Sequence, residues 1–97
     1  RLVITEPMTM ANEETLILYL RNGCGYCHYV QDAIRKLGLT VEERNIWEDP
    51  AFEEELMSVT GRRVVPVLRA IDNEGASRWI PESRDIIEYL VSHHSAA

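Results

Sequence analysis

The sequence predicts an α/β fold in which a mixed four-stranded sheet is flanked by helices. Short apolar runs typical of strands alternate with segments whose apolar residues recur at helical spacing. The order of these elements is strand–helix–strand, then helix, then strand–strand–helix. This order combines a parallel pair of strands with a hairpin. The 97 residues suffice for one domain with a modest core.

The first part of the domain is predicted to be a strand–helix–strand unit. Residues 16–20 are a continuous apolar run, which suits a strand buried on both faces. From Cys27 to Leu37 the apolar residues recur at helical spacing, and Gly38 fits the end of that helix. Residues 40–45 form the next predicted strand. Because a helix joins the two strands, we expect them to be parallel, with a right-handed crossover.

The second part is predicted to contain a helix, a hairpin and a final helix. Asp49 as cap and Pro50 at the first position open a helix that Gly61 ends. Residues 66–71 and 77–80 are predicted strands on either side of a turn. Ser83 is the predicted cap of the last helix. The apolar residues of that helix are Ile86, Ile87, Tyr89, Leu90 and Val91.

Outside these elements the chain carries few signals. Residues 1–14 are predicted to be a tail with a short extended piece at 2–4, so that the domain covers residues 15–97. No apolar run is long enough to cross a bilayer, and none near the start resembles a signal peptide. The first residue is Arg1 rather than Met, so the sequence does not tell whether a leader or membrane anchor was removed. The net charge of −6 argues against nucleic acid or an anionic membrane as the main partner.

The two cysteines of the chain form the motif Cys24-Gly25-Tyr26-Cys27, where the first strand gives way to the first helix. This spacing indicates a redox dithiol. At a helix N-terminus the pKa of Cys24 is expected to fall from about 8.5 into roughly the range 3.5–7.5. Cys27, one turn further, is expected to be less exposed and to have the higher pKa. A zinc site is the alternative, but zinc takes four ligands, and there is no second cysteine pair. A single motif of this kind indicates a reducing compartment, so we expect a cytoplasmic protein.

The predicted elements have the arrangement of the thioredoxin fold, and the stretch from about Thr15 to Val91 resembles a glutaredoxin. Residues 21–27 resemble the active-site segment of that family, and residues 60–66 resemble the segment that leads into its cis-proline. Residues 80–86 fall where the family binds the γ-glutamyl end of glutathione. The resemblance implies a glutathione-dependent thiol–disulfide oxidoreductase that acts on glutathionylated or disulfide-containing proteins. Its expected roles are electron transport and cell redox homeostasis.

The resemblance also implies contacts with the cysteinyl and glycyl parts of glutathione. A cis bond between Val65 and Pro66 would turn the backbone N–H and C=O of Val65 toward the cysteinyl unit. Tyr26 would form an apolar wall beside the thiol. Candidate cations for the glycyl carboxylate are Arg21 and either Arg62 or Arg63. For each arginine, a solvated surface charge is the alternative.

At the γ-glutamyl end three residues are candidates. Ser83 and the backbone N–H groups after it can bind the carboxylate, and Asp85 can accept from the ammonium. Glu82-Ser83 is also similar to the glutathione site of glutathione-transferase N-domains, which makes Glu82 the third candidate. A plain cap at Ser83 and an acid that stabilises the helix dipole at Asp85 are the structural alternatives.

The remaining aromatic residues and His28 are expected to lie outside the site. Trp47, Trp79 and Phe52 are interpreted as packing residues, and His28 as a surface histidine.

Two departures from the glutaredoxin pattern keep other functions open. Gly25 stands where dithiol members often have proline, and relatives without that proline can share a [2Fe-2S] cluster between two protomers. The alternative function is therefore a dimer bridged by a [2Fe-2S] cluster, with Cys24 and glutathione as the cluster ligands. Without a cluster, we expect a monomer. Pro81-Glu82 replaces a frequent Gly-Gly pair, which suggests as a third hypothesis a piece of a glutathione transferase. The sequence shows no helical domain after the last helix, which counts against that hypothesis.

Overall fold

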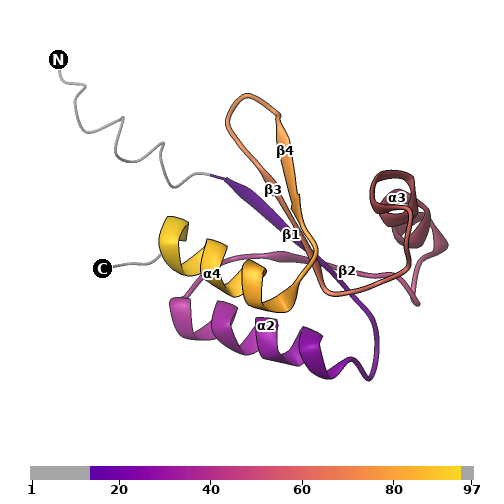
Figure 1. Cartoon of the computed structure of the whole chain (residues 1–97), viewed down its shortest axis with the longest axis horizontal. Helices are drawn as coiled ribbons and strands as arrows, with labels where there is room; N and C mark the ends of the chain where they lie inside the picture. Colours follow the sequence, from indigo (N-terminus) through magenta and orange to yellow (C-terminus); the bar gives the residue numbers. More distant parts are fainter. Residues whose placement is uncertain (1–13, 95–97) are drawn as a thin grey trace, which may run out of the picture.

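The computed structural model describes residues 14–94, so the predicted extended piece at 2–4 lies outside the described residues (Figure 1). A single sheet has the strand order β2-β1-β3-β4, in which β1 pairs parallel with β2 and antiparallel with β3, and β3 pairs antiparallel with β4. The predicted mixed four-stranded sheet is therefore confirmed. Within residues 14–94, no helix has the length and apolar character needed to cross a membrane. The elements are β1 (Thr15–Leu20), α2 (Gly25–Leu37), β2 (Glu42–Asn45), α3 (Pro50–Thr60), β3 (Val67–Ile71), β4 (Ser77–Ile80) and α4 (Ser83–His94).

Helices cover both faces of the sheet. In Figure 1, α2 and α4 lie side by side, and α3 stands apart from them. Alternate residues of β1 point to opposite faces, as in any strand. Leu16 and Leu18 pack in the core beneath α2 and α4, whereas Ile17 and Tyr19 pack in a smaller core with Leu56 of α3. The run at 16–20 is apolar throughout because β1 is buried on both faces.

The helix ends follow the predicted signals, with one correction. The Asp49 carboxylate accepts a hydrogen bond from the backbone of Ala51 at the start of α3, and Gly38 and Gly61 end α2 and α3 in the left-handed conformation. The predicted cap at Ser83 is wrong, because Ser83 is already the first residue of α4. The carbonyl of Glu82 accepts the first helical hydrogen bond, from the N–H of Ile86, so Glu82 occupies the cap position.

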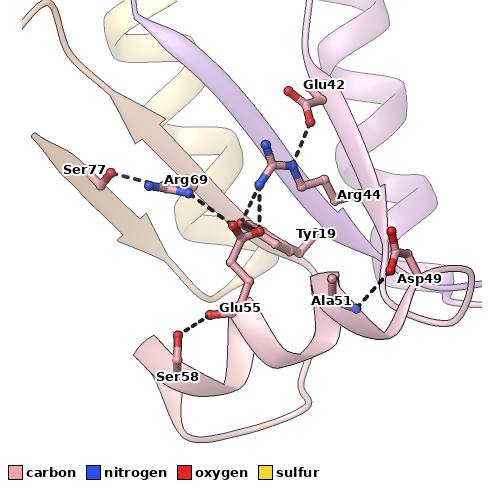
Figure 2. A network of polar contacts seen from close by, with 9 residues as sticks. All are labelled: Tyr19, Glu42, Arg44, Asp49, Ala51, Glu55, Ser58, Arg69 and Ser77. Carbon is pink, nitrogen blue, oxygen red and sulfur yellow. Dashed lines mark hydrogen bonds and ion pairs between the residues drawn. The ribbon is translucent and has the colours of Figure 1, made fainter. Parts of the chain in front are cut away.

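A polar network attaches α3 to the sheet (Figure 2). The Glu55 carboxylate accepts hydrogen bonds of 2.6 Å from both the Tyr19 hydroxyl and the Arg44 guanidinium. The guanidinium of Arg69 lies 3.8 Å from the same carboxylate. Leu56 is the single fully buried side chain of α3 among the described residues, so this network is a large part of what holds the helix. Since α3 leads directly into residues 61–66, the network also fixes the start of that segment.

A second polar cluster joins the start of β1 to the end of α4. The carboxylate of Glu14 accepts a hydrogen bond from the Tyr89 hydroxyl at 2.6 Å and contacts Nε2 of His94 at 2.7 Å. Glu14 is the last residue of the predicted tail, yet it is bonded to the folded domain.

Candidate active site

Cys24 lies at the junction of β1 and α2, in the cap position of the helix. Its backbone is extended, with φ −92° and ψ 111°, and its Sγ accepts a hydrogen bond of 3.2 Å from the backbone N–H of Cys27. The first turn of α2 contains no acidic residue. The sulfur therefore lies at the positive end of the helix dipole with one backbone N–H directed at it, an arrangement that favours a thiolate nucleophile.

Cys27 lies one turn further along α2 and is the more deeply buried of the two free thiols. Its exposed fraction is 2%, against 4% for Cys24, so the predicted order of exposure is right but the difference is small. Burial, followed by the hydrogen bond with Cys24, raises the pKa of Cys27 to about 12. In this pair, the Cys24 sulfur caps the helix, whereas Cys27 is a buried thiol that stays protonated near neutral pH.

The peptide bond between Val65 and Pro66 is cis, as the resemblance implied, and lies opposite Cys24. The Sγ of Cys24 is 3.9 Å from the carbonyl oxygen of Val65, close enough for a weak contact of the thiol with this acceptor. Within residues 14–94, the backbone N–H of Val65 has no hydrogen-bond partner. An extended ligand could therefore pair with Val65 directly beside the Cys24 sulfur.

A hollow beside this peptide brings together several of the predicted site residues; we call it the Val65 groove. It has a volume of about 330 Å³ and is formed by the start of α2, the cis-proline segment and the entry to α4. The backbone N–H groups of Ser83, Arg84 and Asp85 at that entry have no intramolecular acceptor in the described part of the chain. Its lining residues are Tyr26, Val64, Val65, Pro66, Pro81, Glu82 and Ser83.

Four of the charged candidates, Arg21, Arg62, Arg63 and Asp85, do not line the Val65 groove, whereas the fifth, Glu82, does. Arg63 points to the other side of its segment and pairs with Glu53 at 3.3 Å. Arg21 lines a separate polar hollow that also touches both cysteines, and its guanidinium lies 5.2 Å from the ring centre of Trp47. Asp85 is exposed in the first turn of α4.

A second hollow adjoins the first, and sequence reasoning missed it; we call it the Trp79 pocket. It has a volume of about 320 Å³ and shares Val64, Pro81 and Glu82 with the Val65 groove. The sequence indicates only a packing role for Trp79, because no sequence pattern marks a gap between a helix end and a strand edge. The lining residues are Val59, Thr60, Arg62, Val64, Val67, Trp79, Pro81 and Glu82.

No three or more His, Cys, Asp or Glu side chains gather into a group that could hold a metal ion in the part of the chain from 14 to 94.

Comparison with known proteins gives a family match and a set of similar folds. The family model described as Glutaredoxin matches residues 16–75, more than half of the chain. A buckwheat glutaredoxin–glutathione complex is similar with a TM-score of 0.59 and 21% identity, over 92% of this chain and 78% of that one. No curated protein matches the sequence. The predicted thioredoxin-like fold is confirmed.

Glutathione-linked enzymes of greater length are also similar. A glutathione transferase homologue from Drosophila mojavensis with bound glutathione has a TM-score of 0.71 at 22% identity, over 87% of this chain and 37% of that one. A maleylacetoacetate isomerase from Anaeromyxobacter dehalogenans with bound dicarboxyethyl glutathione has a TM-score of 0.64 at 25% identity, over 86% and 38%. The chain spans little more than a third of the length of these two proteins.

Proposed function

The chain belongs to the glutaredoxin family, and we propose that it is a glutathione-dependent thiol–disulfide oxidoreductase that reduces glutathione mixed disulfides and protein disulfides. The observation that carries the proposal is the position of the Cys24 sulfur. It caps α2 at 3.2 Å from the Cys27 N–H and lies 3.9 Å from the carbonyl of Val65, which lines the groove. A nucleophile and a place for an extended thiol peptide thus lie side by side.

The proposed reaction begins at the glutathione sulfur of a mixed disulfide. The thiolate of Cys24 attacks that sulfur, a new disulfide forms between Cys24 and glutathione, and the protein thiolate leaves and takes up a proton. A second glutathione thiolate then attacks the adduct, which frees Cys24 and gives oxidised glutathione. Overall, the mixed disulfide and one glutathione thiol give the protein thiol and oxidised glutathione, one half of which is the glutathionyl group that was bound to the protein.

Cys27 provides a second route for resolving the adduct. Its thiolate attacks Cys24, glutathione leaves, and a Cys24–Cys27 disulfide forms that two glutathione molecules later reduce. Because the pKa of Cys27 is raised to about 12, this route is slow unless the attacking thiol loses its proton during the step. We therefore assign Cys27 mainly to the reduction of protein disulfides, where an internal resolving thiol releases a bound protein.

In the proposed complex, glutathione lies in the Val65 groove. The backbone N–H and C=O of Val65 pair with the cysteinyl unit, and Tyr26 covers it. The free N–H groups at Ser83 and after it bind the γ-glutamyl carboxylate. Glu82 lines the groove and is better placed than Asp85 to accept from the ammonium.

For the glycyl carboxylate, the structure favours Arg62 over Arg63. Arg62 lines the adjoining pocket, whereas Arg63 is paired with Glu53. Arg21 adds positive charge on the other side of the two cysteines rather than in the groove.

We expect the reaction to take place in a reducing compartment such as the cytoplasm, with the protein as a monomer.

A glutathione-coupled assay on a small glutathione mixed disulfide tests the proposal, with oxidised glutathione followed through its NADPH-dependent reductase. We expect turnover by the wild type and none by Cys24→Ser. Turnover by Cys24→Ser at the wild-type rate, or none by the wild type, refutes it. The matched variant Cys27→Ser, which exchanges the same atoms in the same helix, retains substantial turnover.

Glutathione transfer to an electrophile is the second candidate, because similar structures include a transferase homologue and because Glu82-Ser83 lines the groove. Conjugation of glutathione to a model electrophile by the Cys24→Ser variant supports it, since transfer does not need that thiol.

In the cluster-binding alternative, Cys24 would be the sulfur ligand from this chain, and glutathione would supply a second sulfur ligand. Cys24 suits an iron ligand by chemistry, and the residue is 4% exposed. Anaerobic incubation with iron, sulfide and glutathione tests this alternative. A colourless monomer afterwards excludes it.

A further inference from the structure

We propose that Trp47 is a positioning residue of the active site: its ring holds the guanidinium of Arg21 beside the two cysteines. The guanidinium in turn assists the step in which Cys27 resolves the glutathione adduct of Cys24. This inference rests on the proposed function and adds to it a residue from outside the groove.

Trp47 occupies a place that packing does not explain. The sequence indicates a packing role for it, yet the residue is 60% exposed and belongs to neither core of the domain. It lies in the turn between β2 and α3, and its ring centre is 5.2 Å from the guanidinium carbon of Arg21. A guanidinium at this distance over a tryptophan face is attracted by the negative charge of the ring face. The exposed ring therefore has a charged partner in the segment that precedes the first cysteine.

Hydrogen bonds fix the turn that carries Trp47 to that same segment. The N–H of Trp47 donates to the side-chain oxygen of Asn45 at 2.9 Å, and the side-chain amide of Asn45 donates to that of Asn22 at 2.8 Å. The N–H of Ile46 donates to the carbonyl of Leu20 at 2.9 Å. These bonds join the turn after β2 to the loop between β1 and α2, so the ring keeps its place beside that loop.

The guanidinium of Arg21 brings positive charge next to the two cysteines. It lines the polar hollow of about 280 Å³ that touches both of them, and its Nη1 donates to the carbonyl of Asn22 at 3.1 Å. Glu43 and His28 line the same hollow, and the Glu43 carboxylate accepts a hydrogen bond of 2.8 Å from Gln31. Among residues 14–94, no carboxylate forms an ion pair with Arg21. Its charge therefore acts on the cysteines without an ion pair to neutralise it.

Arg21 acts on the cysteine that has to lose its proton. Burial and the hydrogen bond with Cys24 raise the pKa of Cys27 to about 12, whereas the backbone and the charge of Arg21 lower it. In the resolving step the Cys27 thiolate attacks the Cys24 sulfur, a disulfide forms between them, and glutathione leaves as a thiolate that takes up a proton. A positive charge nearby speeds this step because it stabilises the attacking thiolate. Without the ring, the long arginine side chain spreads over its other rotamers and its charge leaves the site for part of the time.

The test measures the release of glutathione from the adduct in a single turnover. Each reduced variant is mixed with an equal amount of a glutathionylated peptide, without free glutathione, and samples are quenched with acid. Peptide thiol reports the formation of the Cys24 adduct, and free glutathione reports the attack by Cys27. We expect Trp47→Leu to form the adduct and then to release glutathione about two- to fivefold more slowly than the wild type, the factor of an exposed cation–π contact. Trp47→Phe, which keeps an aromatic face, should release it at a rate closer to that of the wild type.

Two further variants show whether the ring acts through the guanidinium. Arg21→Gln should slow the release by at least as much as Trp47→Leu, and the addition of Trp47→Leu to Arg21→Gln should slow it no further. The matched control is Tyr29→Leu, at an aromatic residue of α2 that is 65% exposed and has no arginine over its ring in the described structure. This control should release glutathione at the wild-type rate.

Salt provides a measurement on the unmodified protein. Release by the wild type should slow between about 0.01 M and 1 M salt, as the screening length falls from roughly 30 Å to 3 Å, whereas release by Arg21→Gln should not. Equal salt dependence of the two proteins overturns the proposal. So does release by Trp47→Leu at the wild-type rate, equal slowing by Trp47→Leu and Trp47→Phe, or an effect of Trp47→Leu that persists in full beside Arg21→Gln. Absence of any adduct on Cys24 in the wild type refutes the proposed function itself, and this inference with it.

Discussion

The sulfur of Cys24 accepts a hydrogen bond from the backbone N–H of Cys27 at a distance of 3.2 Å. The same turn of α2 that supplies this donor buries the Cys27 side chain and raises its pKa to about 12. One helical turn thus makes the two cysteines unequal: the sulfur of the first accepts a hydrogen bond from the helix backbone, and the second is held as a neutral thiol.

This difference predicts selective alkylation. At pH 8 the native, reduced protein should be alkylated by iodoacetamide at one site, Cys24. The thiolate is the reactive form, and Cys27, with a pKa of about 12, remains protonated at pH 8. Peptide mapping by mass spectrometry identifies the modified residue. Cys27 should react only after denaturation or as the pH approaches 12. Equal labelling of both cysteines in the folded protein at pH 8 contradicts this assignment.

Substitution of Cys27 by serine distinguishes the reduction of glutathione mixed disulfides from the reduction of protein disulfides. Cys27→Ser should keep more than about a third of the wild-type rate on a small glutathione mixed disulfide, because external glutathione resolves the adduct. On a protein disulfide the same variant should be slower by about tenfold or more, because no internal thiol releases the bound protein. A coupled assay with both substrates measures the two rates. An equal loss on both substrates means that Cys27 supports the structure of the site rather than the second step.

The Glu55 network predicts a link between α3 and glutathione binding. Glu55→Gln weakens the contacts with Tyr19, Arg44 and Arg69 and should lower the free energy of unfolding by about 1–2 kcal/mol. Because α3 leads into the cis-proline segment, KM for glutathione should rise more than kcat falls. Urea unfolding and steady-state kinetics measure the two effects. The control is Glu54→Gln, next in sequence, whose carboxylate has no partner in the described structure; similar effects of both variants contradict the role of the network.

Predictions from the sequence succeeded where a local pattern has one physical solution. The spacing of the two cysteines after an apolar run required a strand–helix junction, and Asp49-Pro50 and Gly61 bounded α3. The groove residues Tyr26, Val65, Pro66, Glu82 and Ser83 came from three separate segments and do meet. The sequence left alternatives open where the answer depends on tertiary packing. Arg62 and Arg63 are neighbours that point to opposite sides of the same segment, and no periodicity in the sequence indicates which of the two faces the pocket.

The same dependence on tertiary packing explains why the sequence predicted neither the Glu55 network nor the Trp79 pocket. The network joins polar residues of three strands to one helix, and partners so distant in sequence leave no local signal. The pocket is the space left between α3 and β4, which depends on how the helix sits rather than on any segment alone. The Ser83 cap was missed by one residue, within the usual uncertainty of helix ends.

The Glu14 cluster predicts loss of stability in acid. Burial alone raises the pKa of Glu14, but hydrogen bonds from Tyr89 and His94 outweigh it and leave this pKa below its ordinary value. A lowered carboxyl pKa contributes stability above the pKa of the unfolded chain, and this contribution is lost as the pH falls through the folded value. Glu14→Gln should therefore be less stable than the wild type at pH 7, by about 1–2 kcal/mol. The difference should shrink below about pH 4. Urea midpoints at several pH values measure it, and a constant difference between pH 7 and pH 3 contradicts the prediction.

Gly25 predicts a stabilising substitution. It is the first residue of α2, a β-carbon built there meets no atom within 4 Å, and its N–H donates no hydrogen bond among the described residues. Proline is favoured at this helix position, so Gly25→Pro should raise the free energy of unfolding by about 0.4–1 kcal/mol. The midpoint of urea unfolding of the reduced protein measures the change. A lower midpoint than that of the wild type means that the N–H of Gly25 has a stabilising partner.

The most direct measurement of the central claim is the mass of the trapped intermediate. Cys27→Ser is mixed with an equal amount of a glutathionylated peptide, without free glutathione, and the reaction is quenched with acid. We expect one glutathione on the protein, mapped to Cys24, and an equal amount of free peptide thiol. Peptide attached to Cys24 with free glutathione in solution, or no adduct on Cys24, contradicts the claim that the Val65 groove presents the glutathione sulfur to Cys24.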